Sequence, residues 1–517
     1  MTLLLSLFHI EGQIWQHLLN TVLWEYISQS FLLLVGVSCF SVLLGVSNAW
    51  TIAQCQFPGR HTLEWLLLLP LAMPAYIVAY TYTGILDAAG PVQEFLRETF
   101  NLDYGDYWFP EIRSLSGAIF VLSLVLYPYV YLLTRAALLE QSQSLRDASR
   151  TLGANSWQIF IRIALPLARP AIVVGWSLVM METLADYGTV QYFGVSTFTT
   201  GIFRTWFAMG EQMAAAQLSL FLLGFIAIIL LLEQTSRRQK RYFQTGQMSS
   251  SSDRLSLNSL QSCCAILLAL VPVLLGFFVP VYFLMDWAFL SYATVIDDEY
   301  LSIIWNTLML ASITAILAVV LAVLLAYSQR YLQKQSINSL LRIAGLGYAI
   351  PGTVIAVGVL IPFIWFDKLI NTLTEKVFSY DVGLLLSGTV FILIFAYLVR
   401  FMSIALNSAM AAFDTIRISL DESARLQGIR GASLIRRIHL PLLHSSLLSA
   451  LLLVFVDVLK ELPATLVLRP FNFNTLAVRA YEFANEERLL DASVPSLTIV
   501  LTGLIPVILL SRAMNKS

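Results

Sequence analysis

The sequence predicts an all-α polytopic membrane protein built from two homologous halves of about six transmembrane helices each. Three observations predict this fold: the composition, a series of long apolar runs and an internal repeat. Of the 517 residues, 58% are hydrophobic and only 12% are charged, whereas soluble domains carry about 25% charged residues. The chain therefore has the composition of a membrane protein.

Eleven apolar runs approach or reach the ~20 residues that are needed to cross ~30 Å of hydrocarbon. In chain order they are Phe31–Ala53, Leu63–Leu86, Leu115–Leu139, Pro170–Leu184, Ala214–Leu232, Cys264–Leu290, Thr307–Tyr327, Ile343–Trp365, Val382–Ala405, Leu447–Leu459 and Ser496–Leu510. The runs that begin at Pro170 and Leu447 are short unless they extend through polar residues. Helices are expected because backbone groups find no water in the bilayer core, and a barrel would instead need alternating segments of ~10 residues.

A polar stretch, Glu233–Ser259, divides the chain nearly in half. Basic residues followed by a serine run are typical of a flexible linker. We therefore expect residues 1–234 to form a first transmembrane half, residues 235–260 a linker and residues 261–517 a second transmembrane half.

The two halves repeat one another. The sequence "AMPAYIVA" at Ala72 matches "AIPGTVIA" at Ala349 with an offset of 277 residues. The sequence "DASRTLGANSWQIFIRIALPL" at Asp147 matches "ESARLQGIRGASLIRRIHLPL" at Glu422 with an offset of 275 residues. Nearly constant offsets in separate regions indicate a duplication, and twelve spans are then expected. At the 277 offset Met1 aligns with Phe278, so "MTLLLSLFHI" is predicted to be the tail of an incomplete first helix.

Basic residues set the expected orientation. The linker and both copies of the duplicated block are basic, whereas Asp87–Ser114 carries six acids against two arginines. Alternating spans place the linker and both blocks on one side of the membrane. That side is predicted to be cytoplasmic.

Each copy of the duplicated block has the same internal spacing. An acidic residue is followed six positions later by a glycine, Gly153 or Gly428, and thirteen positions after that by a proline, Pro166 or Pro441. Glycine suits a helix C-cap, and an acid suits the first turn of the preceding helix. We predict a short helix, a turn and a second short amphipathic helix before the proline begins the next span. A charged helical hairpin of this kind is typical of a docking element for a soluble partner, although a single such block would equally suit a basic anchoring loop.

This block resembles the "EAA…G…I.LP" coupling loop of permease subunits in binding-protein-dependent ABC importers. The matching positions are Asp147, Ala148, Ser149, Gly153, Arg162 and Pro166 in the first copy, and Glu422, Ser423, Ala424, Gly428, Arg437 and Pro441 in the second. Departures from the family pattern are mild: Asp147 replaces glutamate, and Ser149 and Ser423 replace alanines. The resemblance covers nearly the whole chain and is strongest to fused, two-half ferric iron permeases, on stretches such as "QFPGR" at Gln56 and "METLADYGTVQYFGVSTFTTGIFRTWF" at Met181. Thiamine, polyamine and sulfate permeases share the coupling loop and remain alternatives for the substrate.

The resemblance implies a type I ABC importer permease in a bacterial inner membrane, surrounded by the lipid bilayer. It implies two ATP-binding cassette ATPase subunits and one periplasmic or extracellular substrate-binding protein as partners, with no nucleic acid. The sequence contains no G-x-x-x-x-G-K-[ST] phosphate-binding loop, so the chain is not expected to be the ATPase. No cofactor is expected on this chain; ATP and Mg²⁺ belong to the partner subunits.

Polar residues inside spans are costly and are candidates for the translocation path. Glu182 and Asp186 repeat as Asp457 and Glu461, and the i, i+4 spacing predicts that each pair lies on one helix face. Carboxylates and the phenol of Tyr187 suit Fe³⁺ as hard oxygen ligands. The structural alternative is that these acids cap helices or form ion pairs with Lys460, Arg204 or Arg479.

Other features carry less weight. The four cysteines and five histidines show no metal-ligand spacing, no metal ligand is firmly assigned, and His439 in the second block is expected to be a surface contact. Pro74 and Pro351 lie within apolar runs and are expected to kink helices. A secondary transporter would more commonly be built from inverted repeats, and a membrane enzyme would show a catalytic motif that this sequence lacks.

Overall fold

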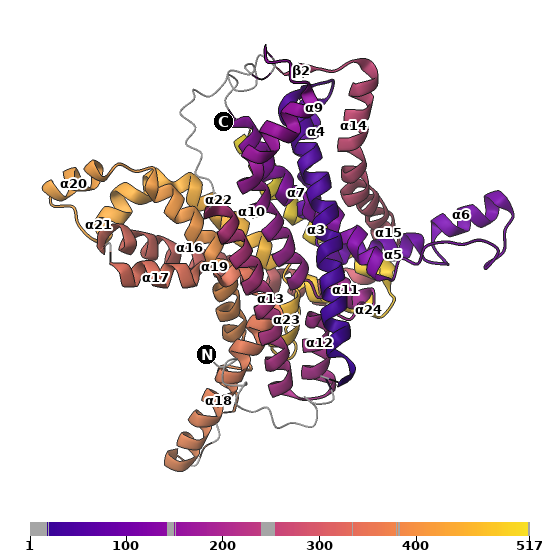
Figure 1. Cartoon of the computed structure of the whole chain (residues 1–517). Helices are drawn as coiled ribbons and strands as arrows, with labels where there is room; N and C mark the ends of the chain where they lie inside the picture. The colour runs from indigo at the N-terminus through magenta and orange to yellow at the C-terminus, as the bar shows by residue number, and fades with distance from the viewer. Residues whose placement is uncertain are drawn as a thin grey trace. The chain divides into compact units, whose positions relative to one another are not determined.

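The computed structural model describes residues 18, 20–141, 149, 151–238, 254–332, 334–378, 380 and 383–514. The regular structure of these residues is helical apart from two strands of two residues each (Figure 1). Ten helices in this part of the chain are long and apolar enough to cross a membrane, and a bent pair brings the count to eleven if it is one span. The predicted all-α polytopic membrane fold is confirmed.

The described helices pack as two compact units. One, the N-terminal unit, comprises the described parts of residues 11–204 and 220–289, and the other, the C-terminal unit, comprises those of 205–219 and 290–517. These units follow packing, whereas the two predicted halves follow the sequence repeat, so one division does not test the other. Most of the predicted linker, and the predicted helix tail at residues 1–10, lie outside the described residues.

The N-terminal unit is built around three long helices. Its elements are α3 (Leu23–Gln54), β1 (Cys55–Gln56), α4 (Arg60–Leu66), η2 (Leu69–Ala72), α5 (Ala75–Leu86), α6 (Pro91–Phe100), α7 (Leu115–Leu139), α9 (Ser156–Ile159), η3 (Phe160–Ala164), α10 (Leu165–Ala185), α11 (Gly188–Tyr192), α12 (Phe198–Phe203), β2 (Leu255–Ser256), α14 (Ser259–Val273) and η5 (Leu274–Phe278); η4 (Arg204–Ala208), α13 (Gln212–Arg238) and α15 (Val279–Val295) continue into the C-terminal unit. Helices α3, α7 and α10 pack against one another. Close approach requires small residues here, because a Cβ atom at Gly45 or Gly175 would lie 2.6 or 2.8 Å from atoms of Val130.

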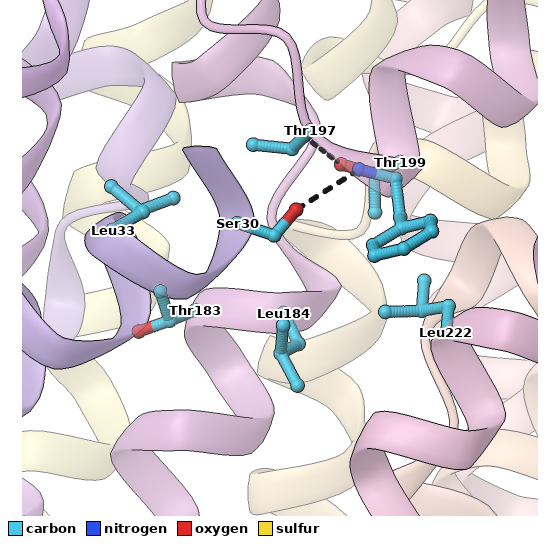
Figure 2. A pocket seen from close by; sticks show the side chains of 8 residues that line it. Ser30, Leu33, Thr183, Leu184, Thr197, Thr199 and Leu222 are labelled. Carbon is cyan, nitrogen blue, oxygen red and sulfur yellow. Dashed lines mark hydrogen bonds between the residues drawn. The ribbon is translucent and has the colours of Figure 1, made fainter. Parts of the chain in front are cut away.

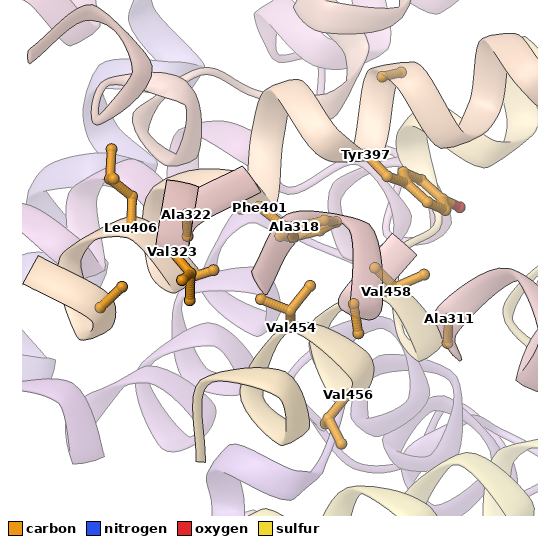
Figure 3. Packing of buried hydrophobic residues seen from close by; sticks show 14 of the residues in the cluster. Ala311, Ala318, Ala322, Val323, Tyr397, Phe401, Leu406, Val454, Val456 and Val458 are labelled. Atoms are coloured by element: carbon orange, nitrogen blue, oxygen red, sulfur yellow. The ribbon is translucent and has the colours of Figure 1, made fainter. Parts of the chain in front are cut away.

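The C-terminal unit has a core of α16, α19 and α22. Its elements are α16 (Asp298–Leu332), α17 (Gln335–Ala344), η6 (Gly347–Ala349), α18 (Gly352–Phe378), α19 (Val390–Asp414), α20 (Ile418–Leu426), α21 (Ala432–Leu434), η7 (Ile435–His439), α22 (Leu440–Leu459), α23 (Pro463–Leu468), α24 (Leu476–Asn485) and α25 (Leu489–Met514). Figure 3 shows Ala318 and Ala322 of α16 in the same hydrophobic cluster as Phe401 of α19 and Val454 of α22. Small side chains at helical spacing let these helices approach closely.

The helices predicted to kink at proline are in fact interrupted there. The predicted single run Leu63–Leu86 is divided into α4, η2 and α5, and its two parts are bent by 92°. Met73 and Ile350, which precede Pro74 and Pro351, both have extended backbones, with ψ of 118° and 125°. A proline disfavours helical geometry in the residue before it, so each copy of the repeat has a 3₁₀ turn, a break and then a new helix.

Candidate functional site

Both copies of the duplicated block turn at their glycine in the same way. Gly153 and Gly428 have φ of +83° and +80°, a left-handed conformation that glycine adopts without steric cost. The amide of the residue after each glycine donates to the carbonyl five residues earlier: Ala154 to Ser149, and Ile429 to Ala424, both at 3.0 Å. This is the Schellman end of a helix, as the glycine spacing predicts. Asp147 and Ala148 lie outside the described residues.

The part of each block after the glycine is not a separate short helix, contrary to the prediction. In the second copy, α21, η7 and α22 form one continuous helical segment, Ala432–Leu459. In the first copy, α9, η3 and α10 run from Ser156 to Ala185 without a break. Both predicted short spans, from Pro170 and from Leu447, are therefore extended toward the block.

A wider turn explains how the helix passes each proline. Just before Pro166 and Pro441, the amides of Leu165 and Leu440 donate to carbonyls five residues earlier, on Phe160 and Ile435. Such π turns are rare and often occur at functional sites. A proline removes one amide and clashes with the preceding turn of an α-helix, and the wider turn accommodates it without ending the helix.

The second block exposes most of its candidate docking residues. Exposed positions are Glu422, Ser423, Gly428, Arg437 and Pro441, whereas Ala424 is buried. In the first block Gly153, Arg162 and Pro166 are exposed and Ser149 is half-buried. Large apolar side chains are exposed beside both turns, with Leu152 87% and Leu426 90% accessible. An exposed mixture of charged and apolar side chains suits a protein partner.

His439 is not a surface residue, contrary to the prediction. It is fully buried, and its Nε2 lies 2.9 Å from Oδ1 of Asp421. Burial by itself raises the pKa of the Asp421 carboxyl, but the hydrogen bonds from His439 and Arg330 outweigh it and hold that pKa below its usual value. Asp421 therefore remains ionised in the block, one residue before Glu422. Sequence reasoning missed it because the family pattern begins at the next position.

The two predicted acid pairs do not each lie on one helix face. Asp186 follows the last residue of α10, and Glu461 follows the end of α22, so the second acid of each pair stands beyond its helix. Asp186 instead lies two residues before α11 and caps its first turn: its carboxylate accepts hydrogen bonds from the Thr189 hydroxyl at 2.9 Å and the Val190 amide at 3.1 Å. The predicted i, i+4 geometry fails because the helix ends between the two acids.

Glu461 caps the first turn of α23 in the same way, and it also has a charged partner. Its carboxylate accepts from the amides of Ala464 and Thr465, both at 3.2 Å, and from Nη1 of Arg400 at 2.7 Å. Both Arg400 and Glu461 are buried. The capping alternative therefore describes the local geometry of Asp186 and Glu461, but the ion-pair partner is Arg400 of α19, which the sequence does not indicate.

The remaining candidates have distinct surroundings. Asp457 forms an ion pair with Lys460 at 2.8 Å, as the structural alternative anticipates. No hydrogen bond or ion pair holds the Glu182 carboxylate within the described part of the chain. The ring of Tyr187 is buried and stacks on Phe203 with 3.8 Å between centroids.

A small cavity lined by both hydroxyl-bearing and apolar side chains lies beside the end of α10. Its lining residues are Ser30, Leu33, Thr183, Leu184, Thr197, Phe198, Thr199 and Leu222. Figure 2 shows the hydroxyl of Ser30 accepting from a backbone amide, that of Phe198, at 3.2 Å. The cavity volume is about 10 Å³, which is room for about one water. This cavity is therefore not a chamber for a transported solute. Among the described residues, no group of three or more His, Cys, Asp and Glu side chains is arranged to hold a metal ion.

Comparison with known proteins identifies the class to which this architecture belongs. Residues 41–241 match the family of binding-protein-dependent transport system inner membrane components. The chain is a multi-pass permease of this binding-protein-dependent class in a bacterial inner membrane.

Individual relatives cover the chain to different extents. The Fe(3+)-transport system permease protein FbpB 2 of Haemophilus influenzae is 25% identical over 94% of this chain and 90% of its own length. The ferric transport system permease protein FbpB of Actinobacillus pleuropneumoniae is 26% identical over 86% of this chain and 64% of its own length. The molybdenum transport system permease protein ModB of Escherichia coli is 29% identical over 41% of this chain and 94% of its own length. The ferric relatives are thus similar to most of the chain, whereas the molybdenum relative is similar to less than half of it.

Proposed function

We propose that this chain translocates ferric iron that an external binding protein delivers, and that two separate ATPase subunits drive it through the two duplicated blocks. The observation that carries the iron assignment is the similarity to a ferric permease over 94% of the chain and 90% of that relative. ATP and Mg²⁺ would be bound by the partner subunits alone.

The duplicated blocks support the docking part of the proposal. Each presents a helix that ends at a left-handed glycine, followed by a helix that continues into a span. A partner that moves the exposed turn would therefore move a membrane-crossing helix directly. Closure of the two ATPase subunits would press both blocks, and the attached helices would open the path to the docked binding protein.

A tetrahedral oxyanion such as molybdate is a second candidate substrate. The specific observation in its favour is the 29% identity to a molybdenum permease over 41% of the chain. Because an oxyanion and a ferric ion have opposite charge, the two candidates predict opposite effects of acids along the path.

Uptake measurements distinguish the two substrates. Cells that lack their own ferric and molybdate importers would express this chain with its ATPase subunits and binding protein, and would be given radioactive iron or radioactive molybdate. We expect iron uptake that requires ATP and the binding protein, with no molybdate uptake above background. Molybdate uptake without iron uptake would overturn the iron assignment while retaining the permease class.

Neutralising Glu182 or Asp457 tests whether these acids lie on the iron path. We expect Glu182→Gln and Asp457→Asn each to lower iron uptake about tenfold, which corresponds to about 1.4 kcal/mol, because a carboxylate favours a trivalent cation. Folding should persist, since Glu182 loses no ion pair within the described chain and the partly exposed Asp457–Lys460 pair contributes only about 0–1 kcal/mol.

The matched control is Glu299→Gln, which neutralises an exposed acid at the start of α16. Iron uptake and ATP hydrolysis would be measured side by side in reconstituted vesicles. Normal uptake in both test variants would exclude the acids from the path and leave Asp457 a structural role only.

A further inference from the structure

A buried carboxylate joins the second block to the helices behind it. Asp421 is in α20, the nine-residue helix that precedes Gly428, and it is buried although its neighbours Glu422 and Ser423 are exposed. Its Oδ2 accepts from Nε of Arg330 at 2.6 Å, and its Oδ1 lies 2.9 Å from Nε2 of His439. Arg330 belongs to α16 and is 91 residues away in sequence, whereas His439 belongs to η7 and is 18 residues away.

Arg330 extends this connection to a further helix. Its two terminal nitrogens donate to the carbonyls of Phe413 and Ile416, at 2.7 and 2.9 Å. Phe413 is in the last turn of α19 and Ile416 is in the connection to α20. One guanidinium therefore ties α16, the end of α19 and α20 together with three hydrogen bonds, in a fixed fork geometry that lysine cannot reproduce.

His439 holds the other side of α20. It ends the π turn that leads into α22, and its ring contacts those of Phe413 and Tyr327, with centroids 5.0 and 5.6 Å apart. Its Nδ1 is buried and has no hydrogen-bond partner in the described structure. The imidazole thus makes one directional polar contact, to Asp421, and is otherwise enclosed by aromatic rings.

The first copy of the block cannot form the same arrangement. At the offset of 275, Arg146 occupies the position of Asp421 and Ala164 that of His439. The Ala164 carbonyl accepts a neutral hydrogen bond from Gln141 at 3.0 Å. A buried charge cluster exists in this half, but its described members, Arg60, Glu64 and Arg135, belong to α4 and α7 rather than to the block.

We propose that Arg330, Asp421 and His439 form a clasp that couples the second block rigidly to the helices behind it, through side chains that the first block lacks at the matching positions. This inference rests on the proposed function, in which ATPase subunits move the blocks. The short helix α20 lies between two turns, so it can transmit a displacement only if it is fixed to the helices that must move. The clasp fixes α20 to α16, α19 and α22. The three are positioning residues for transport: they act through the helices and touch neither ATP nor the substrate.

The test uses the complete complex of this chain, ATPase subunits and binding protein in lipid vesicles, and measures iron uptake and ATP hydrolysis together. We expect Asp421→Ala and His439→Leu to lower the ratio of iron transported to ATP hydrolysed at least tenfold, while the ATPase subunits still copurify. His439→Gln retains an amide donor for Asp421 and should keep a ratio within about twofold of the unmodified protein. The matched control is Asn338→Ala, which breaks a neighbouring hydrogen bond between α16 and α17, from Gln329 to Asn338 at 3.2 Å, and removes none of the hydrogen bonds of the clasp.

The outcomes separate the clasp from the proposed function. A ratio unchanged in Asp421→Ala and His439→Leu would overturn the clasp, and so would a ratio that falls equally in His439→Gln and His439→Leu. If these variants lost both the copurification of the ATPase subunits and the yield of protein, the cluster would be a folding element, and the clasp would also be overturned. Absence of iron uptake by the unmodified complex, with transport of another solute still coupled to ATP, would instead overturn the iron assignment; the same ratio measured for that solute would then test the clasp.

Discussion

Replacing Gly428 by valine is expected to uncouple solute uptake, which is iron uptake under the proposed function, from ATP hydrolysis. Gly428 has φ +80°, and nothing lies within 4 Å of a Cβ built there, so the penalty comes from backbone conformation and not from a clash. A left-handed conformation costs an L-residue about 1–2 kcal/mol, and more for a β-branched one. That penalty changes the population of the turn by roughly five- to thirtyfold. We expect uptake in vesicles to fall by a similar factor, and the Gly153→Val/Gly428→Val double variant to lose uptake.

Two controls isolate the backbone effect. Gly428→Asn should retain most uptake, because asparagine enters the left-handed region more readily than other residues. Gly224→Val places the same side chain in α13, at a glycine that also has open space around its Cβ but an ordinary φ, and should transport normally. Normal uptake by the double valine variant would contradict the role of the blocks in coupling.

Breaking the Arg400–Glu461 pair is expected to give the largest loss of folded protein. Both side chains are buried, and Glu461 also caps α23. Removing one member of a buried pair leaves an uncompensated charge and costs about 3–5 kcal/mol. Arg400→Met should therefore lower the thermal unfolding temperature of the detergent-solubilised protein and reduce its amount in the membrane.

The double variant Arg400→Met/Glu461→Gln separates charge from packing. It removes both charges while the glutamine retains an acceptor for the amides of α23, so we expect it to recover much of the stability lost in Arg400→Met, since a buried pair contributes little more than neutral side chains of similar size. An unfolding temperature of Arg400→Met equal to that of the unmodified protein would show that the pair does not stabilise the fold.

The candidate site could be predicted only where it depends on contacts close in sequence. The turns at Gly153 and Gly428 follow from spacing, since a helix end involves residues a few positions apart. The continuity of α21, η7 and α22 could not be predicted, because proline normally interrupts a helix and only the wider hydrogen-bonded turn shows how this one continues. The acid pairs cannot be placed by helix periodicity for a similar reason: the backbone has already left the helix at Asp186 and Glu461.

The sequence by itself determined the fold class, the duplicated blocks and their turns. Apolar length, repeat offset and glycine position are properties of the chain that a bilayer and local sterics convert directly into helices and caps. Only the tertiary structure decided which charges meet. Arg400 reaches Glu461, and Arg330 and His439 reach Asp421, across sequence separations of 61, 91 and 18 residues. The physical reason is that a buried charge needs a partner, and packing decides which partner lies close to it. Local periodicity predicts helices but does not predict how distant helices pack.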